Sequence, residues 1–423
     1  MSARAFPIAT AAPPSVKGWC PGALRPMLSG DGLLVRLRIT GGIVPSRTLS
    51  RVGDLAAHHG NGLIDISQRA NLQIRGVRSD THDPLIADLR DLGLIDTDPG
   101  AEAVRNVVGS PLAGLDATAK IDGAALVAAL EARLREDADL HALPDKFGFL
   151  VDDGGRLSLC DVAADVRLTG TPGGLHLAIG GDGSSAAPVA MLPPADAVAG
   201  AVALARAFLV LRGSGDIRRM RDLVRAVGVD AIRSAAGLAG AMGPWPTAST
   251  RLSDILGVQP GFVGVGAPFG RFTAAQVRIL ADVSAGEVRL TPWRAVLVPG
   301  VDPGAAAVLA EAGLILDPRD ARLSVAACPG RPDCPSGAVD TREAATVLAP
   351  LVAGRDGVVL HVSGCSKGCA RPRAAPVTLS GRDGLFDLIV DGRADGAPIH
   401  RDLDLAGARA AVETLLSKLE ERP

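Results

Sequence analysis

Residues 62–77, GLIDISQRANLQIRGV, align without a gap on residues 286–301, GEVRLTPWRAVLVPGV. The alignment matches glycines near both ends of the segment. Each copy alternates apolar residues over two short runs, which is typical of strands. A shared pattern at this distance along the chain predicts an internal duplication.

The segments that flank the two copies also correspond. Upstream lie 47–60, RTLSRVGDLAAHHG, and 273–286, TAAQVRILADVSAG, both with apolar residues at helical spacing. Downstream lie 84–96, PLIADLRDLGLID, and 305–317, AAAVLAEAGLILD, both with a Gly-Leu pair suited to a helix stop. Three matched elements in the same order favour a duplicated unit.

Each copy is predicted to form a helix, two strands and a helix, with one further strand at 33–40 before the first copy. Such a half cannot cover both faces of its own sheet, so we expect the halves to pack as one α+β unit about a pseudo-twofold axis. A mixed α/β stretch follows each copy. The predicted division is two half-domains, two α/β modules and a connection, at 20–95 and 251–318, 96–212 and 319–423, and 213–250.

Four of the six cysteines lie in the C-terminal third, in two close pairs. Cys328 and Cys334 stand in ACPGRPDC, and Cys365 and Cys369 stand in SGCSKGC. Thiolates select iron–sulfur clusters or zinc over hard metals, and four cysteines are the usual ligands of a 4Fe–4S centre. The pattern predicts a cluster-binding redox enzyme.

Zinc is the alternative metal for this set of thiol ligands. Structural zinc sites usually separate paired ligands by two to four residues, whereas five residues separate Cys328 from Cys334. Both pairs also lie among Pro, Gly and Ser, whose turns can direct backbone N–H groups at an anionic cluster. The spacing therefore favours iron–sulfur over zinc.

Three basic residues stand beside turns or strand ends in the N-terminal half. They are Arg69 in SQRANLQ, Arg105 in VRNVVGSP and Lys146 in LPDKFGF. Taken singly, such residues more often lie at a surface without chemistry. The half with these motifs lacks the paired cysteines, and this asymmetry predicts one active site between two specialised halves.

Composition excludes several classes of partner. The formal net charge is -2 over 423 residues with mixed signs throughout, so neither nucleic acid nor an anionic membrane is expected as a partner. The most apolar helical segment, 197–211, is short for a membrane span and contains Arg206. Thiols available for metal predict a cytoplasmic location.

The ordered motifs resemble the nitrite and sulfite reductase superfamily over nearly the whole chain. They are LLVRLRITGG, GNGLIDISQRANLQIRG, VRNVVGSP, LPDKF, ACPGRPDCPSG and SGCSKGCARP. The resemblance implies duplicated ferredoxin-like half-domains and two α/β modules around a sirohaem that shares a cysteine with a 4Fe–4S cluster. It implies that the four paired cysteines bind the cluster, with Cys369 at the bridging position, and that Arg69, Arg105 and Lys146 hold an anionic substrate.

Three positions depart from the reductase pattern. Ala70, Gly148 and Lys367 stand where reductases commonly carry Gln, a second Lys and Asn. Losing a cation removes charge stabilisation for a small oxyanion. The segments around Arg69 and Cys365 look most similar to the precorrin-3B synthase branch of aerobic cobalamin biosynthesis.

That branch implies an oxygenase rather than a reductase. Precorrin-3A, a polycarboxylate tetrapyrrole, would be hydroxylated at C20 with O2 and closed to a lactone, giving precorrin-3B. The 4Fe–4S cluster would pass electrons from NADH, a reduced carrier or a donor protein to a mononuclear non-haem iron whose ligands the sequence does not identify. The alternatives are a sirohaem-dependent nitrite or sulfite reductase and a non-enzymatic, metal-stabilised scaffold or electron-transfer module.

Overall fold

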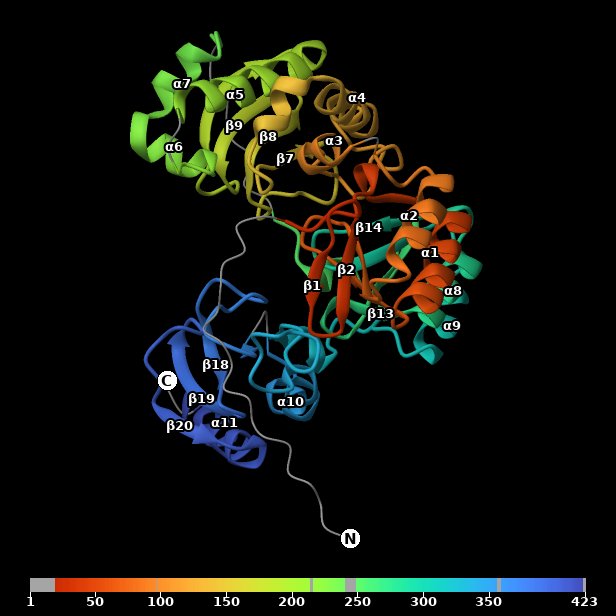
Figure 1. Ribbon diagram of the computed structural model, residues 1–423, viewed down its shortest axis with the longest axis vertical. Coiled ribbons are helices and arrows are strands. Elements are labelled where there is room, and N and C mark those ends of the chain that lie inside the picture. The colour runs from red at the N-terminus through yellow and green to blue at the C-terminus, as the bar shows by residue number, and fades with distance from the viewer. Residues whose placement is uncertain (1–19, 97, 214–215, 240–248, 356–358, 421–423) are drawn as a thin grey trace.

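The computed structural model describes residues 20–96, 98–213, 216–239, 249–355 and 359–420. Figure 1 shows three lobes. One contains both half-domains, with red and orange elements beside green and teal ones. The first α/β module forms a second lobe, and the second module, in blue, forms the third.

The half-domain lobe contains two five-stranded antiparallel sheets. Their strand orders are β1-β2-β5-β4-β13 and β11-β12-β15-β14-β3. The strands are β1 (Met27–Ser29), β2 (Gly32–Leu37), β3 (Ile43–Pro45), β4 (Leu63–Ile66), β5 (Leu72–Val77), β11 (Gly257–Gln259), β12 (Phe262–Gly266), β13 (Arg271–Thr273), β14 (Glu287–Leu290) and β15 (Ala295–Pro299). Each half thus completes its sheet with a strand from the other, β13 beside β4 and β3 beside β14.

The helices follow the same duplication. They are α1 (Ser46–His59) and α2 (His82–Asp91) in the first half, and α8 (Ala274–Val283) and α9 (Ala305–Glu311) in the second. The turn between the repeated strands places Ala70 (φ 53°) and Arg294 (φ 62°) in the same left-handed conformation. The predicted duplication and pseudo-twofold arrangement are therefore confirmed.

One hydrophobic core joins the two halves. On α1, Leu49, Val52 and Ala56 recur at helical spacing and are buried. They lie in the same cluster as Val277 and Leu280 of α8. Because neither half buries its helix and sheet alone, the halves form one folding unit.

The two α/β modules share a second common topology. The sheet orders are β10-β9-β8-β7-β6 and β16-β17-β18-β19-β20, each with three parallel strands followed by two antiparallel ones. The strands are β6 (Val107–Gly109), β7 (Phe149–Asp152), β8 (Ala164–Thr171), β9 (Gly174–Gly181), β10 (Ala187–Leu192), β16 (Val325–Ala327), β17 (Leu360–Ser363), β18 (Ala375–Arg382), β19 (Leu385–Gly392) and β20 (His400–Leu403).

The modules also contain helices, some of which occupy matching places in the chain. They are α3 (Pro99–Val104), α4 (Gly123–Glu136), α5 (Ala197–Leu211), α6 (Met220–Val227), α7 (Val229–Ala235), α10 (Thr341–Leu348) and α11 (Leu405–Glu420). Short 3-10 turns are η1 (Thr40–Gly42), η2 (Ala138–Ala142), η3 (Pro194–Asp196), η4 (Leu252–Ile255), η5 (Pro268–Gly270), η6 (Ala321–Ser324) and η7 (Ala349–Val352). In both modules one helix follows the first strand and another follows the last.

Two helices lie where the sequence predicts only a connection, within 213–250. Met220 and Leu223 of α6 and Ile232 of α7 are buried in the core of the first module. The first module therefore extends beyond the boundary expected at residue 212. Residues 240–248 of the expected connection lie outside the described part of the chain.

By length and composition, Pro194–Leu211 would suffice to cross a membrane. Within the described residues it is the single helix of this kind. Leu204, Ala205 and Phe208 of this segment are buried in the core of the first module. We therefore describe it as a core helix.

Candidate cluster and cation site

The paired cysteines lie on two loops that leave neighbouring parallel strands. Cys328 and Cys334 follow β16, and Cys365 and Cys369 follow β17. The two strands pair in register, with Ala327 opposite Val362. Because parallel strands end at the same edge of a sheet, both loops begin side by side.

Main-chain hydrogen bonds hold the two loops against each other. The N–H of Gly364 donates to Cys328 Sγ at 3.2 Å, and the N–H of Ala338 donates to the Gly364 carbonyl at 2.7 Å. A Cβ on Gly364 of the second loop would lie 3.2 Å from the Cα atoms of Gly330 and Gly337 in the first loop. The glycines in the two cysteine motifs are therefore required for this close approach.

The thiols interact electrostatically. Burial raises the pKa of Cys328, and the neighbouring Cys334 raises it further, against N–H groups of Gly364 and Gly330. Partial desolvation raises the pKa of Cys369, and Cys328, Cys365 and Cys334 add to the effect, while Lys367 opposes it. All four cysteines thus lie in one electrostatic neighbourhood that disfavours free thiolates and favours a bound cationic centre.

The four cysteines match the usual ligand set of a 4Fe–4S cluster. Within the described residues, no three His, Cys, Asp or Glu side chains converge closely enough to hold one metal ion. A cubane cluster separates its thiolates more widely, because each thiolate binds a different iron. The described residues contain no ligand group for the mononuclear iron expected from the resemblance.

Arg69 and Lys146 lie next to each other. Arg69 Nη2 donates to the main-chain carbonyl of Lys146 at 2.7 Å, while Arg69 Nη1 is buried without a hydrogen-bond partner in the described chain. Burial lowers the pKa of Arg69, Cys20 opposes this, and Arg219 adds to the lowering. A guanidinium with an open donor among like charges favours an anionic ligand.

Sequence reasoning overlooked two further arginines near Arg69 and Lys146. The positive region around Arg69 and Lys146 is called the cation surface below. Arg36 lies on β2, and Arg38 comes directly after the last residue of that strand, so the two are two residues apart on one face of the extended chain. Burial lowers the pKa of Arg36 to about 10, and Arg38 and Arg69 lower it against the effect of Cys20. The alternating arginines in LLVRLRIT were the available signal, since a buried face of a strand rarely carries two cations.

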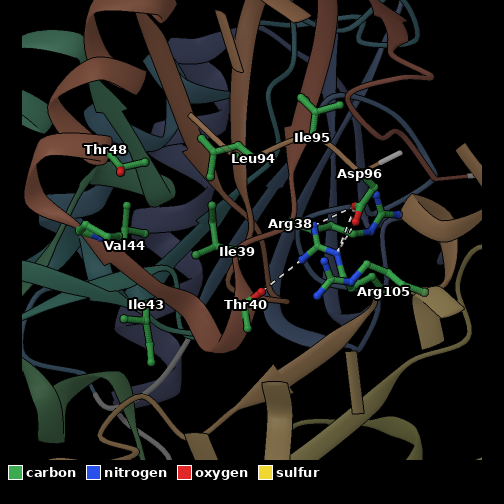
Figure 2. Close-up of a pocket in the computed structure, with 13 residues that line it drawn as sticks. Arg38, Ile39, Thr40, Ile43, Val44, Thr48, Leu94, Ile95, Asp96 and Arg105 are labelled. Carbon is green, nitrogen blue, oxygen red and sulfur yellow. Dashed lines mark hydrogen bonds and ion pairs between the residues drawn. The ribbon is translucent and has the colours of Figure 1, made fainter. Parts of the chain in front are cut away.

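Arg105 occupies a different environment. Its guanidinium binds Asp96 at 2.9 Å and Glu131 at 3.1 Å, and all three side chains are buried. Burial lowers the pKa of Arg105, but the two carboxylates outweigh this and raise it. It lines a cavity of about 250 Å³ together with Arg38, as Figure 2 shows. Its charge is compensated, so the structure does not group it with the open donor of Arg69.

The segment after Cys369 reaches the first module. Arg373 binds Asp182 at 3.1 Å, across the boundary between the two modules.

His361 of β17 is fully buried, and neither ring nitrogen has a partner in the described chain. Burial lowers the pKa of His361 to about 4, and Arg371 lowers it further.

Models of known families match most of the chain. The nitrite/sulfite reductase ferredoxin-like half domain matches residues 25–92 and 258–313, and the nitrite and sulphite reductase 4Fe-4S domain matches residues 100–239. The chain belongs to the nitrite and sulfite reductase family. The second match covers the module without the paired cysteines, whereas Cys328 to Cys369 lie in the module of the same topology.

Relatives of two activities are similar to the chain. A precorrin-3B synthase of Sinorhizobium sp is 32% identical, covering 90% of this chain and 84% of the relative. A ferredoxin–nitrite reductase of Synechococcus elongatus is 31% identical, covering 84% and 77%. The Mycobacterium tuberculosis NirA protein has a TM-score of 0.75 at 22% identity, covering 92% of this chain and 81% of that structure, which shows the shared fold. The chain is an oxidoreductase of this superfamily.

Proposed function

We propose that the protein is an iron–sulfur oxygenase of the precorrin-3B synthase type. It would convert precorrin-3A to precorrin-3B in aerobic cobalamin biosynthesis. The observation that carries this choice is the environment of Arg69. A Cβ on Gly148 would lie 3.6 Å from Arg69 Nη2, so the position where reductases commonly carry a second Lys faces Arg69 and carries no cation.

The cation surface suits a large polycarboxylate better than a small oxyanion. Arg69 and Lys146 present a forked donor and a mobile point charge, which bind carboxylates in different geometries. Arg36 of β2 adds to this positive surface, whereas Arg38 is buried and pairs with Glu102 at 3.6 Å. Several carboxylates on one tetrapyrrole would satisfy these groups together.

The reaction needs external electrons. One oxygen atom of O2 would enter the C20–H bond as a hydroxyl and the other would leave as water. NADH would supply two electrons and one proton, with the second proton from solvent; a reduced carrier would supply only the two electrons, and solvent both protons. When bound, the cluster supplies electrons one at a time. Cys328, Cys334, Cys365 and Cys369 would hold it, and we place the enzyme in the cytoplasm, where these thiols stay reduced.

A sirohaem-dependent nitrite or sulfite reductase is the second candidate. The similarity to the Synechococcus elongatus nitrite reductase favours it, because that relative is almost as similar as the precorrin-3B synthase. In that case the cation surface would hold the carboxylates of the prosthetic group and the small substrate. The two candidates differ in what the cation surface binds.

Purification without oxygen separates the candidates. The protein would be assayed for iron, acid-labile sulfide and sirohaem, with absorption and EPR spectra, and then supplied with precorrin-3A, O2 and NADH. We expect cluster signals, no sirohaem bands and formation of the hydroxylactone. Tightly bound sirohaem, together with reduction of nitrite or sulfite when reduced methyl viologen is the electron donor, would overturn the oxygenase proposal. Protein without acid-labile sulfide would contradict both candidates.

A further inference from the structure

The residue before Cys334 is held by the half-domains rather than by its own module. The main-chain carbonyl of Asp333 accepts hydrogen bonds from Ser29 Oγ at 2.6 Å, from the Gly30 N–H at 3.1 Å and from Arg75 Nη2 at 3.1 Å. A Cβ on Gly30 would overlap the carbonyl oxygen of Pro332. The turn between β1 and β2 is therefore shaped to fit this loop.

The side chain of Asp333 is held as well. Its carboxylate binds the guanidinium of Arg271, which also donates to both oxygens of Asp65 at 2.7 and 3.2 Å. Arg271 lies on β13, directly opposite Asp65 on β4. The strand that the second half contributes to the first half's sheet thus also binds the cysteine loop.

The surrounding charges are matched. Arg75, with 2% of its side chain exposed, binds Asp31 through Nε at 3.0 Å and Nη2 at 2.8 Å. Arg342 of α10 lies 3.7 Å from Asp65. Three arginines and three aspartates form one largely buried network, so the loss of one partner leaves an opposite charge without compensation.

Asp333 transmits this restraint to a cluster ligand. The N–H of Cys334 donates to the Gly330 carbonyl at 2.6 Å, and the Cys334 carbonyl accepts from the Gly337 N–H at 2.9 Å. This tight turn leaves Cys334 little freedom independent of Asp333. Cys328, in contrast, follows β16 directly and bonds within the second module.

We infer that Asp333, Arg271 and Arg75 are positioning residues that hold Cys334 on the cluster. The inference rests on the part of the proposed function that assigns a 4Fe–4S cluster to the four cysteines. Release of Cys334 would expose one iron to oxidant. That iron would leave as Fe²⁺, the remaining three-iron cluster would be one electron more oxidised, and O2 or ferricyanide would accept the electron.

The test compares Arg271→Ala with Arg278→Ala. Arg278 of α8 binds Asp54 of α1 at 2.7 Å, so its loss also breaks an ion pair between the two halves, but one remote in the chain from Asp333. Anaerobically purified variants would be exposed to air or to stoichiometric ferricyanide, with EPR of the three-iron cluster and iron release measured over time. We expect about tenfold faster conversion in Arg271→Ala and the wild-type rate in Arg278→Ala.

A second variant keeps the inference testable if Arg271→Ala does not fold. Ser29→Ala removes one hydrogen bond to Asp333 and no charge, and we expect conversion about threefold faster than in wild type. Wild-type rates in whichever of these variants retains a cluster would overturn the positioning role. Wild-type protein without labile sulfide would instead overturn the cluster assignment, so the two failures are distinguishable.

Discussion

The two α/β modules repeat one architecture with different loop chemistry. Ser110 is the first residue after β6, and Cys328 is the first residue after β16. Ser110 Oγ accepts the N–H of Asp153 at 2.8 Å, and Cys328 Sγ accepts the N–H of Gly364 at 3.2 Å. The same contact thus exists in both modules with oxygen in one and sulfur in the other.

The loops of the two modules differ in which groups accept their main-chain hydrogen bonds. In the first module, Asp116 accepts the N–H of Arg156 at 2.5 Å, and Asp152 accepts the N–H of Leu159 at 2.8 Å. In the second, residues 364–374 contain no Asp or Glu. The first module therefore closes its loops with its own carboxylates, while the second leaves its thiols for a bound cluster and its Asp333 for the half-domains.

Cys328→Ser tests this contrast most severely, because it gives the second module the residue of the first. A hydroxyl is a poor ligand for iron in a cluster, so we expect iron and acid-labile sulfide to fall to near zero in anaerobic protein. Cys160→Ser, in the first module, is the control and should retain the cluster. Full cluster content in Cys328→Ser would break the comparison.

Arg69→Ala separates the cation surface from the cluster. Arg69 Nη1 has no hydrogen-bond partner in the described chain, and a charge-assisted hydrogen bond from it to a ligand carboxylate would be worth roughly 1.5–3 kcal/mol. We expect anaerobic binding of precorrin-3A, followed by absorbance, to weaken about 10- to 100-fold with cluster content unchanged.

Arg69→Lys should give an intermediate affinity, because it keeps the charge and loses the fork. Equal affinity in Arg69→Ala and wild type would remove Arg69 from the binding surface. Loss of the cluster in the same variant would show that the two sites are not separate.

His361→Leu tests a buried difference between the modules. His361 is the second residue of β17, where β7 has the buried Leu150. Because the folded-state pKa is lowered to about 4, stability is fully present above pH 6.5 and is lost as pH falls from 6.5 through 4. We expect wild type to lose about 2 kcal/mol between pH 7 and pH 5 from this group, and His361→Leu to lose none of it.

Thermal unfolding midpoints at the two pH values measure this effect. His400→Leu is the control, since His400 is exposed on β20 of the same sheet. An unchanged pH dependence in His361→Leu would mean that a bound group satisfies the imidazole in the folded protein. That result would connect His361 to the cluster side of the module.

The duplicated half-domains could be predicted because strands and helices repeat with matched glycines. The exchanged strands β3 and β13 could not, since each has three residues and its pairing depends on a distant partner. The repeat of the modules was also hidden, because α4 has 14 residues and α10 has 8. Local periodicity identifies elements, but not which distant edge they complete.

The position of the two cysteine pairs on loops could be predicted, because the turn residues around them are a local property of the sequence; their role as cluster ligands stays a prediction. The state of Arg105 could not, because its compensating carboxylates, Asp96 and Glu131, lie 9 residues before and 26 residues after it. Arg36 and Arg38 were visible as an alternating pair, yet their proximity to Arg69 required the fold. Charge balance is a tertiary property and limits any assignment of binding residues from motifs.

The smallest predicted effect concerns the contact that both modules share. Ser110→Ala leaves the buried N–H of Asp153 without an acceptor, which costs about 1–3 kcal/mol. Ser110→Cys should cost less than Ser110→Ala, because a thiol in this place can accept an N–H, as Cys328 does at 3.2 Å. The free energy of unfolding, measured by denaturant titration, would rank the two variants. Equal losses of unfolding free energy in the two variants would mean that an N–H to sulfur contact contributes no stability. Cys328 would then be explained by iron binding alone.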